Sequence, residues 1–487
     1  MIARPTSCAM DAPTLLYKRL AAHYLEAIRA GTLARGQRMP SLRSLMRLHG
    51  ISLSTALQVC RDLESAGWLE ARERSGYFVR QPARLALAPM AEPAPTQRAP
   101  DPAQYVGIHA RVSAFVASRR DRPVRFNFSI ARAAPHLYPG EGLRSALTKA
   151  LRHRPDLLTM APQQRGDAGF RAVLARRALA HGMTLAPDDI LVTNGCIEAL
   201  NLALRAVAQA GDTVAVESPA FYGLLQVLES LGLRALEIPT SPRTGISLEA
   251  LDLAMQAYPD IRAVVVVPHL QNPLGSLMPD THKQRLLRLC GARGIALIED
   301  DTYTALVDGA TAPRAIKSWD RDGQVIHCAS LHKILAPGLR LGWMAAGRWQ
   351  ARVEMLKYAQ TRNNEALSQI GAAAFMGTGA YDRHLRRLRL ALAEQRDRTA
   401  EAIARYFPAG TRMNLPPGGL QLWVELPPDR SGQALSQAAL AEQIVVAPGA
   451  LFSNSTRFDH CLRINCGWPY SDELDAALRR LGELAAA

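Results

Sequence analysis

The sequence predicts two folded parts of different class. The first is a small unit of three helices and a β-hairpin, and the second is a long α/β unit with a mostly parallel sheet and a smaller α+β domain. Three observations lead to this prediction. Short amphipathic segments and two short strands fill the region up to residue 80, Pro and Ala are frequent in residues 81–125, and strands alternate with helices from about residue 187. With 487 residues, of which 48% are hydrophobic, the chain is long enough for two or three domains.

The N-terminal region has the pattern of three helices and a wing. In the first helix, apolar side chains recur at every fourth position, at Leu16, Leu20, Tyr24 and Ile28, and Gly31 ends the helix. The stretch PSLRSLMRLHG predicts a second helix capped by Ser41. A third helix would bury the face formed by Ala56, Val59, Cys60 and Leu63. The stretches WLEAR and GYFVR predict a hairpin, which completes a winged helix-turn-helix.

Residues 81–125 are expected to link residues 1–80 to residues 126–487. Beyond this linker, the apolar segments DILVTNG, DTVAVESP, RALEIPT, IRAVVVVP and IALIEDD alternate with helical segments of ten or more residues. Unbroken apolar strands of this kind are typical of a parallel sheet that is covered on both faces. After about residue 370, Arg-rich helices and the strands GLQLWVELP, QIVVAP and CLRINCG predict the smaller domain.

Composition restricts the function classes. The excess of 58 Lys and Arg over 43 Asp and Glu gives a formal charge of +15, which favours a polyanionic partner. The seven cysteines form neither a secreted disulfide framework nor a zinc site, so we expect reduced thiols and no metal. We find no secretory leader and no run of about 20 apolar residues that would span a bilayer. These observations predict a cytoplasmic protein without a membrane partner.

The N-terminal 80 residues resemble the DNA-binding domain of the GntR family, over LLYKRLAAHYLEAIRAGTL, GQRMPSLRSL and ISLSTALQVCRDLESAGWLEARERSGYFV. The resemblance implies that double-stranded DNA is contacted through phosphates by Ser41 and Arg43, at the start of helix three by Ser52, Ser54 and Thr55, and at the wing by Arg74 and Gly76. The family commonly has Arg where this chain has Leu53, which leaves Gln58 and Arg61 as candidate base readers. The alternative is a helical interaction module with a solvated Arg face.

A second candidate site surrounds Lys333 in CASLHKILAPGLRLGW, a run that otherwise favours burial. A buried ammonium is costly, whereas a lysine that condenses with the aldehyde of pyridoxal phosphate loses its charge and holds an electron sink. Such a site needs an acid for the ring nitrogen, donors for the phenolic oxygen, a stacking ring and a phosphate cup.

Residues at successive strand ends can supply each of these partners. Asp300 would pair with the ring nitrogen, and Asn272 and Tyr303 would donate to the phenolic oxygen. Phe221 would stack on the ring, with Tyr222 as the weaker candidate. The phosphate would be held by the amides at a helix N-terminus and by flanking side chains: Gly195, Cys196, Ile197, Ser330 and Arg340. Taken singly, these residues have ordinary structural explanations as caps, turns and core residues, and only their joint order along the strands favours the cofactor site.

This constellation resembles the fold-type-I aminotransferases of the aspartate aminotransferase superfamily over about residues 125–480. The resemblance implies that Lys333 forms the Schiff base and that Arg463 in CLRINCG binds the carboxylate of an effector or substrate. The chain departs from the family before RGDAGFR, where Met160 and Ala161 replace an aromatic residue that commonly reaches the partner subunit's phosphate.

A chain that combines these two regions resembles the MocR class of bacterial transcription regulators. That class implies a homodimer with exchanged winged domains, in which an amine, an amino acid or pyridoxal phosphate acts at the Lys333 imine and modulates operator binding. The same residues also permit an active aminotransferase that its DNA-binding unit merely tethers, so whether the chain is an enzyme stays open. A pyridoxal phosphate storage or carrier protein without operator specificity is a third alternative.

Overall fold

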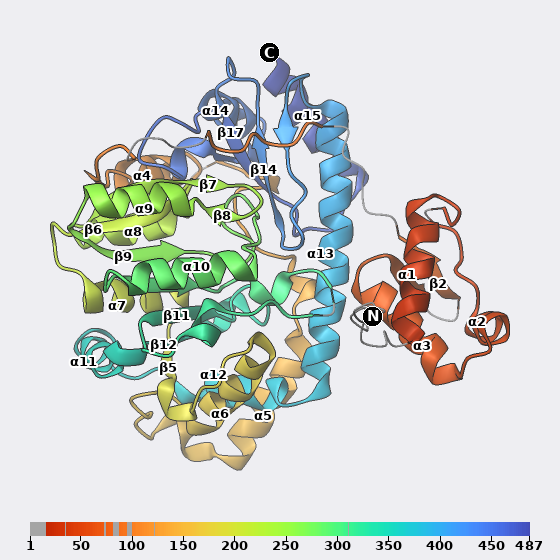
Figure 1. The fold of residues 1–487 in the computed structure, drawn as a ribbon, viewed down its shortest axis with the longest axis horizontal. Coiled ribbons are helices and arrows are strands. Elements are labelled where there is room, and N and C mark those ends of the chain that lie inside the picture. The colour runs from red at the N-terminus through yellow and green to blue at the C-terminus, as the bar shows by residue number, and fades with distance from the viewer. Residues whose placement is uncertain are drawn as a thin grey trace, which may run out of the picture. The chain divides into compact units, whose positions relative to one another are not determined.

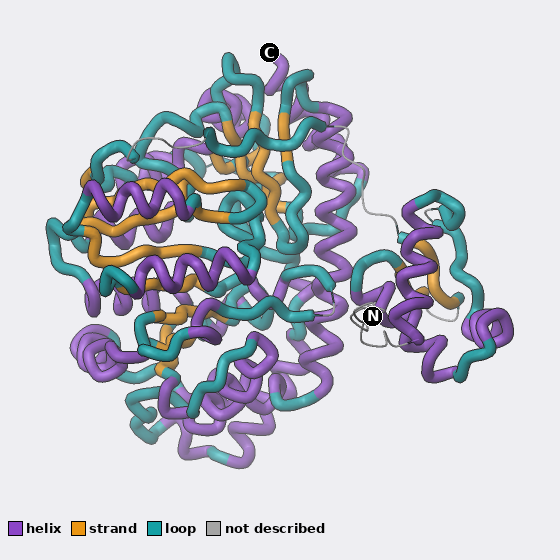
Figure 2. The backbone as a smooth tube through the Cα atoms, in the orientation of Figure 1, coloured by secondary structure: helices purple, strands orange, loops and turns teal. Residues whose placement is uncertain are grey.

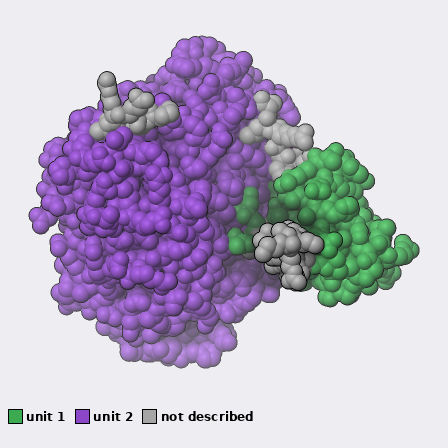
Figure 3. Space-filling view, in the orientation of Figure 1, with its two compact units in different colours: residues 1–83, 308–311 green, residues 84–307, 312–487 purple. Residues whose placement is uncertain are grey.

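The computed structural model describes residues 16–34, 36–72, 75–80, 87–94, 100–120, 122–309 and 311–487. The chain divides into two compact units (Figure 3). Unit 1 comprises Met1–Ala83 and Asp308–Thr311, and unit 2 comprises Arg84–Val307 and Ala312–Ala487. Each unit is described below by itself.

Unit 1 contains the three helices and the hairpin that the sequence predicts (Figures 1 and 2). Its elements are α1 (Leu16–Arg29), α2 (Leu42–His49), α3 (Leu53–Ser65), β1 (Leu69–Arg72) and β2 (Gly76–Val79). The two strands pair antiparallel, with Leu69 opposite Val79. All four residues predicted for the buried face of the third helix are buried. In α1, Tyr24 and Ile28 are buried, but the expectation for Leu16 is wrong, since it lies at the first position of the helix and is 53% exposed.

Five strands of the large sheet of unit 2 lie in the five alternating segments that were predicted, and the predicted fold class is confirmed. Among the described residues it has nine strands in the order β3-β7-β6-β9-β10-β11-β12-β5, with β8 beside β7. Their bounds are β3 (Gln104–Tyr105), β5 (Leu191–Thr193), β6 (Thr213–Ser218), β7 (Arg234–Ser241), β8 (Gly245–Ile246), β9 (Ile261–Val266), β10 (Ala296–Asp300), β11 (Val325–Ser330) and β12 (Gly342–Ala345). Neighbouring strands from β7 to β11 pair in parallel, whereas β12 is antiparallel to both of its neighbours.

Helices cover both faces of this sheet, as its apolar strands require. On one face lie α7 (Cys196–Val207) and α8 (Tyr222–Ser230), and on the other lie α9 (Leu248–Ala257) and α10 (Asp280–Gly291) (Figure 1). Successive residues of β9 serve the two cores, since Val265 packs with the first pair of helices and Val264 with the second. At its carboxyl end, each parallel strand continues into a loop.

The domain boundaries at residues 80 and 125 stay a prediction. Within the interval expected to be a linker, the structure describes β3 and α4 (His109–Ala117), both in unit 2. Strand β3 pairs with β7, and Val112 of α4 is buried in the core that contains α7 and α8. This part of the interval therefore packs on the large sheet.

The remaining elements form a helical layer and the smaller α+β domain. The helices are α5 (Gly140–His153), α6 (Ala168–Ala178), α11 (Gln350–Gln360), α12 (Ala366–Met376), α13 (Gly379–Tyr406), α14 (Gly432–Ala441) and α15 (Asp472–Ala486). The small sheet has the order β13-β14-β17-β16, formed by β13 (Arg412–Met413), β14 (Gln421–Glu425), β16 (Ala447–Pro448) and β17 (Cys461–Asn465). The predicted strand QIVVAP is divided, since its first part, β15 (Ile444–Val445), pairs with β4 (Phe126–Asn127) instead.

Short 3-10 turns connect many of these elements. They are η1 (Pro135–Leu137), η2 (Pro155–Leu158), η3 (Leu179–His181), η4 (Pro187–Asp189), η5 (Thr304–Leu306), η6 (Ile316–Trp319), η7 (Pro337–Leu339), η8 (Gly347–Trp349) and η9 (Gly449–Leu451). Within the described part of the chain, no helix is both long and apolar enough to cross a bilayer.

Candidate functional site

A cavity of about 200 Å³ lies at the carboxyl ends of the parallel strands in unit 2. Parallel strands of an α/β sheet leave a crevice at this edge, where side chains from successive strand ends meet. All but one of the residues predicted to bind cofactor or effector line it: Cys196, Ile197, Phe221, Asn272, Asp300, Tyr303, Ser330, Lys333, Arg340 and Arg463. The exception, Gly195, immediately precedes Cys196 at the N-terminus of α7.

Lys333 follows β11 and its amine is withdrawn from water. The Nζ atom donates a hydrogen bond to the carbonyl oxygen of Ala131 and lies 5.9 Å from the ring centre of Tyr303. Burial, and secondarily the nearby Arg463 guanidinium, lower the pKa of Lys333 to about 7. At neutral pH a large fraction of this amine is therefore uncharged, which is the form that attacks an aldehyde.

Asp300, the last residue of β10, is a buried carboxyl group held by neutral donors. Its Oδ1 accepts hydrogen bonds from Thr302 Oγ1 at 2.6 Å, from the Thr302 amide at 3.2 Å and from Cys196 Sγ at 3.2 Å. Burial raises the pKa of Asp300, against the lowering effect of these hydrogen bonds. No ion pair with Asp300 occurs among the described residues, so a cationic ring nitrogen would meet an uncompensated acid.

The N-terminus of α7 and the residues beside it have the features of an anion cup. Gly195 caps α7 with a φ of 82°, which directs the chain into the helix so that the first amides of α7 are free to donate. Arg340 has a φ of 53° after η7, and its Nη2 donates to the carbonyl oxygen of Asn194 at 3.4 Å. Ser330 ends β11 beside it. These groups can donate to the three oxygens of a phosphate.

Gly342 supports this cup, and the sequence analysis missed it. A Cβ atom at Gly342, the first residue of β12, would lie 2.6 Å from the backbone of Gly195. Only glycine therefore lets β12 approach the turn that begins α7. The signal was present as the glycine two residues after Arg340.

Arg463 on β17 is buried and forms no ion pair with a described carboxylate. Its Nη1 donates to Asn272 Oδ1 at 3.0 Å and its Nη2 donates to the Ser129 carbonyl oxygen, while Nε has no hydrogen-bond partner among the residues that the structure describes. The guanidinium carbon lies 4.9 Å from the ring centre of Phe452. A buried cation with an unused donor favours an incoming anion.

The residues present fit pyridoxal phosphate. An amine with a lowered pKa, a buried carboxyl group that forms no ion pair with a described residue and an anion cup occupy one cavity, and they match the aldehyde, the ring nitrogen and the phosphate. Phe221 and Tyr222 lie on the same wall, with ring centres 5.1 Å apart. Sequence reasoning missed Thr302, although a threonine two residues after a strand-ending aspartate is a recognisable local hydrogen-bond motif.

On the nucleic-acid candidate surface of unit 1, the predicted hydroxyl groups cap helices. Ser41 is the N-cap of α2, and its Oγ accepts a hydrogen bond from the Ser44 amide. Ser52 is the N-cap of α3, and its Oγ accepts a hydrogen bond from the Thr55 amide. The Ser52 hydroxyl also lies 2.8 Å from that of Ser54. These hydroxyl groups therefore fix the N-termini of both helices, which place backbone amides where phosphates are bound.

The cationic and amide candidates differ in availability. Arg43 and Arg61 are exposed, whereas Gln58 Nε2 donates to Asp62 Oδ1 at 2.8 Å within α3. Leu53 is 55% exposed at the start of α3. At the wing, Gly76 opens β2 with a φ of 92°, and Arg74 lies outside the described residues.

Comparison with known families agrees with this division. Residues 138–481 match the family model of aminotransferase class I and II, and residues 16–79 match that of bacterial regulatory proteins, gntR family. Aminotransferases of this class and fold depend on pyridoxal phosphate.

Relatives share the whole arrangement. The chain is 37% identical to the uncharacterized HTH-type transcriptional regulator YdcR of Escherichia coli K12, over 96% of this chain and 98% of that protein. It is also 37% identical to the uncharacterized HTH-type transcriptional regulator YjiR of the same organism, with the same coverage. Among solved structures, α-aminoadipate aminotransferase LysN from Thermus thermophilus, complexed with N-(5'-phosphopyridoxyl)-L-leucine, superposes with a TM-score of 0.71 and 26% identity, over 78% of this chain and 95% of that one. The chain thus belongs to the aminotransferase class I and II family and, with its GntR-family N-terminal region, has the MocR architecture of helix-turn-helix transcriptional regulators.

Proposed function

We propose that this transcriptional regulator binds pyridoxal phosphate at Lys333 and that an amine or amino acid acting there changes its affinity for operator DNA. The observation that carries the proposal is the joint placement of Lys333, Asp300 and Arg463 in one cavity of a chain that also has a GntR-family region. When bound, the cofactor supplies an aldehyde that condenses with primary amines and a ring that withdraws electrons.

Each side chain has a distinct role in this proposal. The neutral Lys333 amine holds the cofactor, and Asp300 keeps a proton on the ring nitrogen. The amides after Gly195 hold the phosphate together with Ser330 and Arg340. Arg463 then uses its unpaired Nε and its two bonded nitrogens to orient a carboxylate of the effector.

The effect on DNA would follow from unequal contacts in two conformations. Arg463 lies on β17 of the small domain, whereas Lys333 and Asp300 follow strands of the large sheet. An effector that contacts both favours the conformation in which they lie close together. In a homodimer with two DNA-reading helices, a change of this kind alters the fit to two half-sites.

The test measures effector binding and DNA binding in the same protein sample. Candidate amines and amino acids are titrated into protein loaded with pyridoxal phosphate, while the cofactor spectrum and the binding of DNA from upstream of the protein's own gene are recorded. We expect an effector to change DNA affinity by about 5- to 150-fold, and linkage then requires DNA to change effector affinity by the same factor. A spectral change that leaves DNA affinity and bending untouched, for every effector that binds, would refute the coupling.

An aminotransferase activity is the second candidate, and the lowered pKa of Lys333 favours it. A group whose pKa lies near the working pH is an efficient proton carrier between a substrate carbon and the cofactor. Amino donors and keto acids incubated with the purified protein would show steady multiple turnovers if the chain is an enzyme. A single stoichiometric conversion would support the regulator alone.

A further inference from the structure

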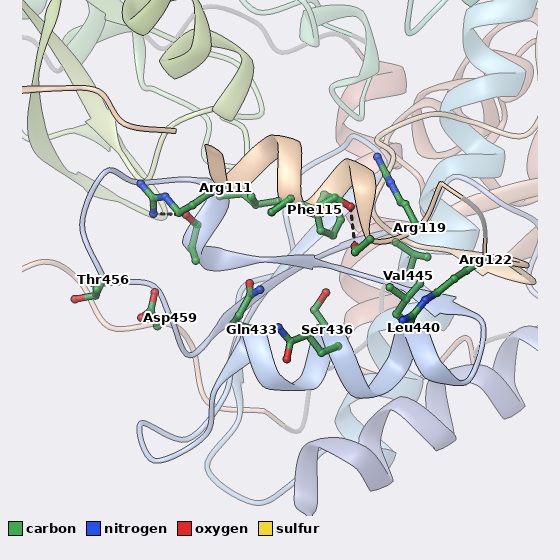
Figure 4. A pocket seen from close by; sticks show the side chains of 15 residues that line it. Arg111, Phe115, Arg119, Arg122, Gln433, Ser436, Leu440, Val445, Thr456 and Asp459 are labelled. Carbon is green, nitrogen blue, oxygen red and sulfur yellow. Dashed lines mark hydrogen bonds between the residues drawn. The ribbon is translucent and has the colours of Figure 1, made fainter. Parts of the chain in front are cut away.

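A second and larger cavity lies between α4 and α14, apart from the cofactor cavity. It has a volume of about 740 Å³ and shares no lining residue with the cavity around Lys333. Figure 4 shows side chains of α4 along one wall and side chains of α14 along the opposite wall. Its volume falls in the range of cavities that bind small molecules, of the order of 300–1,000 Å³.

One end of this cavity is cationic. Arg122 lies there, with its side chain directed toward Leu440 and Val445, whereas the Arg119 guanidinium points the other way, past Phe115 (Figure 4). Arg119 Nη1 donates to Ser129 Oγ at 3.0 Å, and its guanidinium carbon lies 4.7 Å from the ring centre of Phe115. Neither arginine forms an ion pair with any carboxylate in the described part of the chain. Guanidinium groups without a counterion attract an anion and can bind it through two parallel hydrogen bonds.

The middle of the cavity is amphipathic. Phe115 contributes an aromatic wall and Leu451 an apolar one, while Gln433 and Gln437 present amides from successive turns of α14. These two amides make no hydrogen bond to described residues, so they are available to a ligand. A few polar groups around an apolar wall are typical of a small-molecule site.

The other end ties α4 to the small domain. Arg111 Nη1 donates to the carbonyl oxygen of Ala450 in η9 at 2.7 Å, and Asp459 lies near it with Thr456 (Figure 4). Three arginines and one aspartate give the lining a positive balance. The acid at this end would accept from a hydroxyl or amino group of a ligand whose anionic group lies at the far end.

We propose that this cavity binds a small organic anion, with a phosphate or carboxylate group beside Arg122 and an aromatic or alkyl body against Phe115. Such a ligand spans α4, which packs on the core of the large sheet, and α14, which belongs to the domain that carries Arg463. The ligand would connect α4 to the small domain, as the hydrogen bond from Arg111 to the Ala450 carbonyl oxygen already does. The site is independent of the proposed cofactor function because the two cavities share no residues.

Calorimetric titration in phosphate-free buffer tests the proposal. The protein is first incubated with pyridoxal phosphate and desalted, which fills the cofactor cavity. Phenyl phosphate, phenylacetate and inorganic phosphate are the anionic probes, and benzyl alcohol is the neutral one. We expect saturable binding of phenyl phosphate or phenylacetate, with the stronger of the two identifying the anionic group, weaker binding of inorganic phosphate and none of benzyl alcohol.

Two variants locate the binding. Arg122→Gln removes a cation that makes no side-chain hydrogen bond in the described structure, and Gln437→Glu places an acid in the cavity, so each should weaken binding at least about tenfold. Arg120→Gln is the matched control, since Arg120 is an exposed neighbour that does not line the cavity.

Lys333→Ala separates this proposal from the proposed function. Probe binding that survives in Lys333→Ala and is lost in Arg122→Gln and Gln437→Glu supports the second site, whatever happens to cofactor binding. Equal affinity in all variants, loss in Lys333→Ala alone, or no saturable heat with any anion would overturn it.

Discussion

The two candidate functional regions of this chain achieve recognition by opposite physical means. In the cofactor cavity, Asp300 and Arg463 are buried and form no ion pair with any described residue, and the pKa of Lys333 falls to about 7 while that of Asp300 rises. On α2 and α3, the candidate residues are largely exposed, and their hydroxyl groups already bond within the helix termini. The side chains of the cavity are therefore already desolvated before a ligand binds, whereas the exposed residues of α2 and α3 stay solvated until DNA binds.

This difference teaches where to look for large effects. Desolvation makes each charge in the cavity costly until a ligand compensates it, so the removal of one group changes binding strongly. Exposed arginines interact through water and salt, so each phosphate contact adds a modest increment. Mutations in the cavity should therefore have much larger consequences than mutations on the DNA-reading surface.

The largest effect is expected at Lys333. Lys333→Ala removes the only amine among the residues that line the cavity in the described structure, so covalent capture of pyridoxal phosphate should be abolished. The visible absorbance of the bound cofactor and the protein mass after borohydride reduction would both show this loss. Retention of a reducible adduct in the variant would mean that another lysine holds the cofactor.

The next effect is a dependence of stability on pH, expected in cofactor-free protein. The folded pKa of Lys333, about 7, lies below its ordinary value of 10.5, so folding favours the neutral amine. Its stabilising contribution is fully present above pH 10.5 and is lost as the pH falls through 7. The unfolding free energy of the wild type relative to Lys333→Met should therefore rise with pH, by at most roughly 1.4 kcal/mol per unit between these values.

Urea unfolding of both proteins across this pH range measures the difference. Lys333→Met keeps a long apolar side chain, so its packing resembles that of the wild type more closely than Lys333→Ala does. If the difference in unfolding free energy between the two proteins is the same at all pH values, the Lys333 amine is solvated. The cavity would then not differ from the exposed DNA-reading surface in this respect.

An intermediate effect is expected at Arg463. Arg463→Lys keeps the positive charge but removes the planar fork that bonds Asn272 and the Ser129 carbonyl. Loss of a charge-assisted hydrogen bond costs about 1.5–3 kcal/mol, so amino acids should bind at least about tenfold more weakly. Spectral titration with an amino acid and with the matching amine without a carboxylate measures the effect. An equal loss for both ligands would mean that Arg463 only shapes the cavity.

Sequence reasoning placed the strand-end residues well because the order of parallel strands brings their carboxyl ends together. Asn272, Asp300 and Lys333 could be assigned to one cavity from their positions after apolar runs. The hydrogen bond from Cys196 Sγ to Asp300 joins residues 104 positions apart, and that from Lys333 to Ala131 joins residues 202 apart. Such pairings depend on how loops pack in three dimensions, and no local pattern encodes them.

The same limit explains the elements that differ. Leu16 fits the apolar period of α1, but it is the first residue of the helix and is 53% exposed. The antiparallel strand β12 lies between β11 and β5, although β5 comes first of the three in the sequence. Local periodicity identifies a strand and its faces, whereas its neighbour in the sheet is set by the path of the whole chain.

The smallest effect is expected on the DNA-reading surface, where Arg43 and Arg61 provide a matched pair of exposed arginines. If Arg43 contacts a phosphate, Arg43→Ala should weaken binding to operator and unrelated DNA alike and reduce the salt-dependence slope by about one. If Arg61 reads a base edge, Arg61→Ala should cost about 1–3 kcal/mol on the operator alone. Fluorescence anisotropy at several salt concentrations distinguishes the two. A loss of affinity for the operator alone in Arg43→Ala would assign base reading to α2. A complete loss of DNA binding in either variant, as complete as the loss of cofactor capture in Lys333→Ala, would contradict the contrast between exposed and buried sites.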